Sequence, residues 1–216
     1  MDVFTLCLAF GPIAIYLFLL GAINLSRRPL MVTGARDLAA LALALAGLVL
    51  IGPMELFFPL GASTVYHAWV WLFLAVLYLL AIVFLLLMLR PRLVIYNIAP
   101  AQLRPVLSEL AVELDAEARW AGDSLALPNL GVQLHFDSVA ALRNITLAAG
   151  GPTQSHLGWR KLELALADRL AGIEVPRNRG AIAYLAVASV VVLALLLGIA
   201  HDPQAVAQSL FEMLRW

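Results

Sequence analysis

Charged residues, cysteine and lysine are scarce in this chain. Only 13% of its 216 residues are charged and 63% are hydrophobic, whereas a soluble domain has about 25% charged residues. The formal net charge is zero, so no nucleic-acid partner is expected. Cys7 is the single cysteine and Lys161 the single lysine. One cysteine can neither close an internal disulfide nor supply a thiolate zinc site, so disulfide-rich and zinc-finger domains are excluded.

Signatures of common catalytic and cofactor sites are also absent from the sequence. Neither His-Glu-x-x-His nor Gly-x-Ser-x-Gly occurs. The one glycine pair, Gly150-Gly151, is followed by Pro152, which lacks the backbone N–H that a phosphate loop needs. The four histidines are scattered, and no two of them form a pair at metal-ligand spacing along a helix: they are His67, His135, His156 and His201. We therefore expect no cofactor and no metal, and an enzyme is the least favoured class.

Four long apolar stretches hold most of the hydrophobic residues: Val3–Leu25, Leu38–Leu60, His67–Met88 and Gly180–Ala200. A helix rises about 1.5 Å per residue, so about 20 apolar residues cross a hydrocarbon core of about 30 Å. The sequence therefore predicts four transmembrane helices, at about 3–25, 38–60, 67–89 and 180–200. The first follows an acidic residue and is longer than the apolar part of a signal peptide, so we interpret it as a retained span.

The basic residues beside these stretches predict an orientation. Lys and Arg near span ends favour the cytoplasmic side. The loop Ser26–Asp37 holds three arginines, and arginines flank residues 91–179 at both ends, whereas the connection Phe57–Tyr66 has none. We expect both termini outside and residues 91–179 in the cytoplasm of a cell that carries the chain in its plasma or bacterial inner membrane. The tail 201–216 is expected to form an amphipathic helix at the outer interface.

Residues 91–179 have the patterns of a small folded domain. Strand-forming runs occur at 92–97, 124–127, 132–137 and 144–148, and a short last strand is expected at 173–175. Leucines repeat at helical spacing after Pro100, and a second helical stripe follows Ser155 and ends at Gly172. Helices on one face of a mainly antiparallel sheet make an α+β sandwich, and the closest standard topology is the ferredoxin-like split βαβ.

Two groups of polar residues are candidate sites. The outer polar cluster consists of Glu55, His67, His201 and Asp202, near the predicted outer ends of the spans. Glu55 follows Gly52-Pro53, where proline bends a helix, and ionisable groups inside a bilayer are often functional. The four residues are either one site for a proton, cation or metal ion, or separate interfacial residues that mark span ends.

The second candidate is a polar face of the predicted sheet. In the run 132–137 the residues Gln133, His135 and Asp137 point to one side and the apolar residues to the other, and Arg143 is expected opposite them. This face either binds a partner or ligand, or is the ordinary solvated face of an antiparallel sheet.

Three functions remain open from the sequence. The leading hypothesis is a membrane scaffold or accessory subunit whose cytoplasmic α+β domain binds another protein, or a second copy of the chain. The alternative is a transporter or channel subunit that uses Glu55 and the Gly52-Pro53 helix break. A membrane enzyme of unknown type is the third, with His135 and Asp137 as its one plausible pair. The bilayer itself is a partner in all three.

Overall fold

The computed structural model describes the backbone of residues 3–57, 60–139, 143–152 and 154–214. The side chains of residues 53–57, 60–68, 70–71, 205 and 210–214 lie outside the described part. The chain forms two compact units. The first comprises Met1–Leu20, Leu38–Met88 and Ala183–Trp216, and the second comprises Gly21–Asp37 and Leu89–Ile182.

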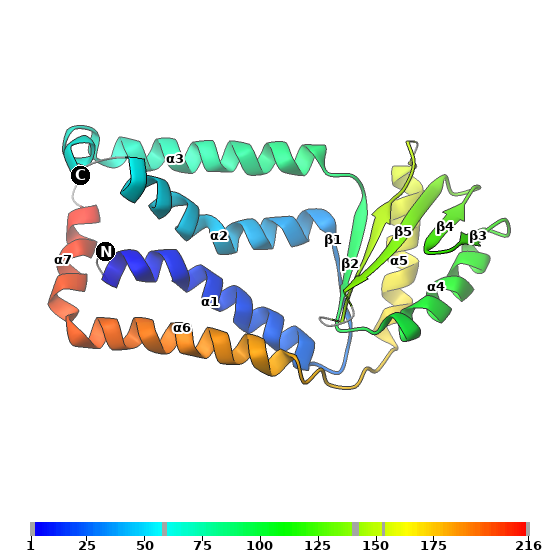
Figure 1. The fold of residues 1–216 in the computed structure, drawn as a ribbon. Helices are drawn as coiled ribbons and strands as arrows, with labels where there is room; N and C mark the ends of the chain where they lie inside the picture. Colours follow the sequence, from blue (N-terminus) through cyan, green and yellow to red (C-terminus); the bar gives the residue numbers. More distant parts are fainter. Residues whose placement is uncertain (1–2, 58–59, 140–142, 153, 215–216) are drawn as a thin grey trace. The chain divides into compact units, whose positions relative to one another are not determined.

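Helices form the first unit, and most of them are long and apolar (Figure 1). They are α1 (Val3–Leu25), α2 (Gly34–Phe57), α3 (Leu60–Met88), α6 (Ala181–His201) and α7 (Pro203–Leu214). Three described segments are long and apolar enough to cross a membrane: Val3–Leu25, Gly34–Gly52 and Ala181–His201. The described apolar part of α3, Leu72–Met88, is shorter. With two candidate spans near the N-terminus and one near the C-terminus, the chain is a multi-pass membrane protein.

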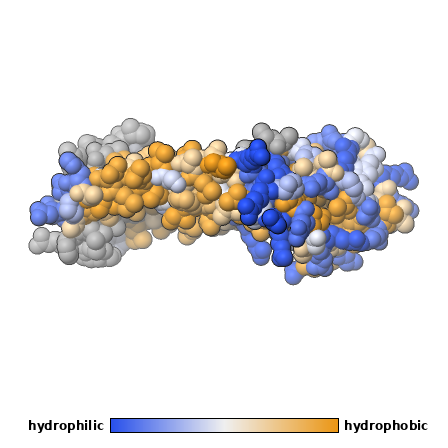
Figure 2. Space-filling view, turned by 90° about the horizontal axis from the view of Figure 1, so that it is seen from below, coloured by the Kyte–Doolittle hydropathy of each residue, from blue (hydrophilic) through white to orange (hydrophobic). Residues whose placement is uncertain are grey.

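On the face that Figure 2 shows, the middle of these helices is mostly hydrophobic. Large apolar side chains such as Leu43, Leu87 and Val190 are exposed, which suits contact with lipid. Small residues bring α1 and α2 close together, since a Cβ added to Gly47 would lie 1.9 Å from the backbone oxygen of Leu8. Close approach through small residues is how membrane helices pack.

A six-stranded antiparallel sheet forms the centre of the second unit. Its strands are β1 (Leu30–Thr33), β2 (Arg92–Tyr96), β3 (Arg119–Ala121), β4 (Ser124–Leu127), β5 (Val132–Val139) and β6 (Asn144–Ala149). They lie in the order β1-β2-β6-β5-β4-β3, and every pair of neighbours is antiparallel. The strands expected near 92–97, 124–127, 132–137 and 144–148 are all present, so the α+β insert is confirmed.

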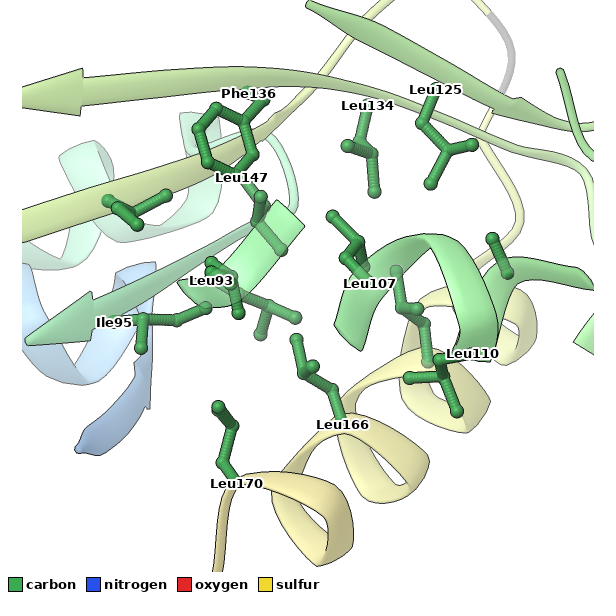
Figure 3. Packing of buried hydrophobic residues seen from close by; sticks show 14 of the residues in the cluster. Leu93, Ile95, Leu107, Leu110, Leu125, Leu134, Phe136, Leu147, Leu166 and Leu170 are labelled. Atoms are coloured by element: carbon green, nitrogen blue, oxygen red, sulfur yellow. The ribbon is translucent and has the colours of Figure 1, made fainter. Parts of the chain in front are cut away.

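Two helices close one face of this sheet. The leucine stripe of α4 (Pro100–Leu114) and that of α5 (His156–Ala171) are buried, as the spacing predicted. Ser155 caps α5, because its side chain accepts a hydrogen bond from the Gly158 amide at 3.1 Å. Figure 3 shows Leu134 and Leu147 of the sheet pointing toward Leu107 of α4. These side chains form one hydrophobic core. Burial of their apolar surface is the main contribution to the stability of the domain.

The strand order differs from the ferredoxin-like split βαβ that the sequence suggested. That topology places one strand between the two strands joined by the first helix, and a C-terminal strand on the other side. Here three strands, β6, β5 and β4, separate β2 from β3. The reason is local: the strands β3 to β6 are joined by short connections, and each pairs with the next as in a meander.

The place beside β2 is taken by a strand from the first loop. Leu30–Thr33 was expected to be an ordinary cytoplasmic loop, but it pairs with β2 with Val32 opposite Val94. The last strand expected at 173–175 is not formed, although these residues are described. Instead the Val175 amide donates a single hydrogen bond of 2.9 Å to the Arg27 carbonyl. The domain therefore includes Gly21–Asp37 as well as the insert.

Candidate functional site

The face of the sheet away from α4 and α5 carries the candidate residues Gln133, His135 and Asp137. Along β5 buried and exposed residues alternate, and these three are exposed. The neighbouring strands present small side chains to the same face. Ala126 of β4 lies opposite Gln133, and Thr146 of β6 lies opposite Asp137. We call the residues of β4, β5 and β6 on this side, which are exposed on β5 and half-buried on β4 and β6, the open face.

Hydrogen bonds hold the side chain of His135 and the backbone of Gln133. Ser124 Oγ lies 3.2 Å from His135 Nδ1, a hydrogen bond whose direction depends on the histidine tautomer. At Gln133 the backbone is held from the side by Gln154, whose Nε2 donates to the Gln133 carbonyl at 3.1 Å. Trp159 Nε1 in turn donates to Gln154 Oε1 at 2.8 Å. The open face is therefore tied to the core helix α5 through a buried aromatic side chain.

Arg143, the fourth residue of this candidate set, has a different role in the structure. It lies in the connection from β5 to β6 with a φ of 50°, in the left-handed region. Its Nη1 donates a hydrogen bond of 2.7 Å to the carbonyl of Pro176. Its guanidinium is thus held by the segment that leads to α6. The candidate site therefore consists of Gln133, His135 and Asp137 on β5, and Arg143 is not part of it.

The pairing of Ser124 with His135 was missed from the sequence. A four-residue turn, Pro128 to Gly131, joins the two strands, and counting back from it places Ser124 opposite His135. A serine beside a histidine resembles the nucleophile and base of a hydrolase. However, such catalysis also needs oriented donors for the oxyanion and a site that excludes water, and this pair stands on an exposed strand face. The arrangement suits contact with another molecule better than bond cleavage.

The outer polar cluster is only partly described. Glu55 and His67 fall on side chains outside the described residues, so their convergence with the others stays a prediction. His201 is the exposed last residue of α6, and exposed Asp202 follows it, before α7 begins at Pro203. The helix α2 runs through Gly52 and Pro53 to Phe57 as one helix. Within the described part of the chain, no group of three or more His, Cys, Asp or Glu side chains is placed to hold a metal ion.

A hollow of about 470 Å³ lies between α1 and α2 in the first unit. Its walls are formed by apolar side chains such as Leu8, Leu43 and Leu50, together with Tyr16. Binding sites for small molecules combine apolar walls with a few oriented polar groups. The walls of this hollow offer mostly hydrocarbon, which suits lipid chains or another apolar helix without selecting a ligand.

A carboxylate at the start of α2 joins two residues of β2. Tyr96 donates its hydroxyl hydrogen bond to Asp37 Oδ1, and Arg92 Nη2 lies 3.6 Å from Asp37 Oδ2. In the pairing register Arg92 and Tyr96 flank Val94 on the same face. Val94 is only 3% exposed although it points away from the core helices. This part of the sheet is therefore covered, and the open face is limited to β4, β5 and β6.

Three asparagines of the second unit join the end of α1 to the end of β2 and to the residues before α6. We call Asn24, Asn97 and Asn178 the asparagine junction. Asn97, which is fully buried, donates from Nδ2 to the carbonyl oxygens of Ser26 at 2.8 Å and Ile23 at 3.3 Å. Asn178 donates from Nδ2 to Asn24 Oδ1 at 3.3 Å. Carbonyl oxygens at a helix end need such partners.

Asp115 is another buried polar residue, and it is structural. Burial by itself would raise its pKa, but hydrogen bonds outweigh that effect and hold the pKa below the ordinary value. The donors are the Glu117 amide, the Asn129 side chain and amide, and the Leu130 amide. The carboxylate thereby ties the end of α4 to the turn between β4 and β5.

Comparison with models of protein families finds no match to this chain, and neither the curated proteins nor the solved structures include a significant match. The candidate site therefore has to be interpreted from its own geometry.

Proposed function

We propose that the chain is an integral membrane scaffold or accessory subunit whose α+β domain binds a partner protein through the open face. The observation that carries the proposal is the exposure of Gln133, His135 and Asp137 on β5. The other face of the same strand is closed by α4 and α5. A sheet with one covered face leaves the other free to bind.

The side chains of the open face favour a protein as the partner. The central residues of β5 offer an amide, an imidazole and a carboxylate, and their neighbours Ala126 and Thr146 are small. Such a ridge flanked by small residues gives a partner's backbone and side chains access to polar groups. Balanced polar groups of this kind supply specificity and orientation more than raw affinity.

We further propose that the domain is cytoplasmic and that both termini lie outside. This orientation rests on the arginines next to the spans. It requires four crossings, and α3 would be the third. At 29 residues, α3 is long enough for a core of about 30 Å. The helix α7 would then lie along the outer interface.

Site-specific photo-crosslinking in native membranes tests the partner proposal. A photoreactive amino acid is placed at Gln133 on the open face, and a matched control is placed at Lys161, an exposed residue of α5. We expect a discrete protein adduct from position 133 and none from position 161. Equal adducts from both positions, or adducts with lipid only, would contradict the proposal.

A second variant tests whether the polar groups make the contact. In the double variant His135→Ala and Asp137→Ala two interactions of about 1 kcal/mol each are removed, so affinity should fall roughly 30-fold. The measurement is the yield of the adduct from position 133 as the amount of partner is varied. A yield that is independent of both side chains would mean that the partner does not use this face.

A further inference from the structure

Two segments that each carry a pair of arginines, and that are far apart in the sequence, lie side by side in the second unit. The Val175 amide donates to the Arg27 carbonyl at 2.9 Å, and the Asn178 amide donates to the Asn24 carbonyl at 3.3 Å. These bonds place the chain from Val175 to Asn178 alongside the residues that follow α1, as Figure 1 also shows. The segment that carries Arg27 and Arg28 therefore runs beside the segment that carries Arg177 and Arg179.

A fifth arginine reaches the same place. Arg143 donates to the carbonyl of Pro176 at 2.7 Å, so its guanidinium lies beside the residue that precedes Arg177. We call Arg27, Arg28, Arg143, Arg177 and Arg179 the arginine cluster. Its charges come from three separate parts of the chain, and no sequence motif contains them.

The arginine cluster is not neutralised within the second unit. Arg27, Arg28, Arg177 and Arg179 are exposed, and among the residues whose contacts the structure describes none of the five forms an ion pair. Elsewhere in the unit Arg104 pairs with Asp123, and Arg169 pairs with Glu113. The nearest acidic residue along the chain is the exposed Glu174. Five positive charges without an ion pair among the described contacts favour an anion at this position.

The position of the arginine cluster along the helices indicates where the anion comes from. Arg27 is the second residue after the end of α1, and Arg179 is the second residue before the start of α6. Both helices are candidate membrane spans. Charges that immediately follow a span lie at the level of the lipid headgroups.

The chemistry of the side chains selects phosphate. A guanidinium presents several N–H donors in a plane and binds phosphate oxygens in pairs, which a lysine cannot do. Asn178 Oδ1 accepts a hydrogen bond from the Gly180 amide at 2.9 Å, and Gly180 is the residue before α6. The N-terminus of α6, which is the positive end of its helix dipole, follows Arg177 and Arg179 directly in the chain. The asparagine junction, with Asn24 and Asn97 buried, holds these segments in register.

We propose that the arginine cluster is a binding site for the phosphate group of an anionic phospholipid. The site is separate from the open face, and the proposal does not depend on the protein partner proposed above. Zwitterionic lipid carries a phosphate too, but its added cationic group offsets the attraction. Selectivity for anionic over zwitterionic lipid is therefore the property to measure.

Native mass spectrometry of the full chain in a neutral detergent provides that measurement. The protein is titrated with phosphatidylglycerol and, separately, with phosphatidylcholine. Each arginine near an anionic lipid contributes about fivefold to binding, so the double variants R27Q/R28Q and R177Q/R179Q should each lower the affinity for phosphatidylglycerol about 25-fold. The control R119Q/R160Q removes the same charge from exposed arginines of β3 and α5. It should change the affinity for phosphatidylglycerol less than about twofold.

Each alternative has its own outcome. Equal affinity for the two lipids, or an equal loss in the control variant, would overturn the proposal, because the attraction would then be general. Displacement of phosphatidylglycerol by inorganic phosphate or glycerol phosphate at similar concentrations would also overturn it, in favour of a soluble phosphate ligand. Thermal unfolding of each variant is followed in parallel, so that a lost lipid signal is counted only for a folded protein. Glutamine keeps the length and polarity of arginine, and neither double variant removes a side-chain hydrogen bond that the structure describes.

Discussion

Replacing Asn97 by alanine tests whether the asparagine junction holds the end of β2. Asn97 is 0% exposed, and it has a φ of 61°. The substitution removes the donor to the Ser26 and Ile23 carbonyls. It also forces alanine into the left-handed region, which costs about 1–2 kcal/mol in a residue with a Cβ and is tolerated better by asparagine.

The magnitude follows from three contributions. Losing the 2.8 Å bond to Ser26 and the weaker 3.3 Å bond to Ile23 costs about 1–3 kcal/mol, because buried carbonyl oxygens lose their partner. The backbone contributes about 1 kcal/mol more. Removing Asn97 Oδ1, which is buried without a hydrogen-bond partner among the described residues, returns about 1 kcal/mol. We expect the free energy of unfolding of the sheet to fall by about 1–3 kcal/mol.

Hydrogen exchange followed by mass spectrometry on the full chain in micelles measures this change. For amides of β2 and β6, which pair with each other, a loss of about 1–3 kcal/mol speeds exchange roughly 5- to 150-fold. Asn144→Ala is the matched control, since Asn144 Oδ1 is also buried without a partner in the described part of the chain. A change of less than about threefold in the Asn97 variant, or an equal change in the control, would refute the assigned role of the junction.

Two further substitutions test the packing and the electrostatics of the domain. Gly158→Ala should lower the free energy of unfolding by about 1–3 kcal/mol, because its new Cβ would lie 2.2 Å from the Leu130 backbone oxygen; Gly172→Ala, whose nearest contact is 3.8 Å, should change the melting temperature little. Asp115→Asn removes a carboxylate with a lowered pKa; its stabilising contribution is present above the unfolded pKa of about 4 and is lost as pH falls through the folded pKa. Melting temperatures of the wild type and the Asp115 variant should therefore differ steadily from about pH 5 to 8 and converge in acid, and a difference that grows in acid would contradict the sign.

The parts of the fold that the sequence predicted are those with local causes. The helix α5 has its signals within one segment: Ser155 caps it, its leucine stripe repeats at helical spacing, and Gly172 ends it. The alternation along β5 placed Gln133, His135 and Asp137 on one side. Period and capping depend on near neighbours, so a single segment suffices to predict them.

The parts that were missed depend on distant pairing. Leu30–Thr33 is a four-residue apolar run in a basic loop, and nothing beside it indicates that its partner is β2, about sixty residues further on. The short strand β3 could have been found, because Gly122 and Asp123 join it to β4 as a two-residue hairpin turn, with Gly122 at a φ of 63°. For the candidate site, the hairpin register would have added Ser124. The position of Arg143 depends on the contact with Pro176, which no local pattern encodes.

The contribution of the first loop changes what counts as the domain. Residues 91–179 alone would leave the outer edge of β2 unpaired, since β1 occupies it, and exposed edge strands pair with other chains. The same cut would remove the carbonyls of Ser26 and Ile23 that Asn97 bonds, so a fully buried amide would lose its acceptors. It would also remove Asp37 from Tyr96 and Arg92. Each loss falls on β2, whose Leu93 and Ile95 belong to the core. The segment Gly21–Asp37 is therefore part of the folded domain, and the chain between the first two spans stabilises the sheet as well as connecting helices.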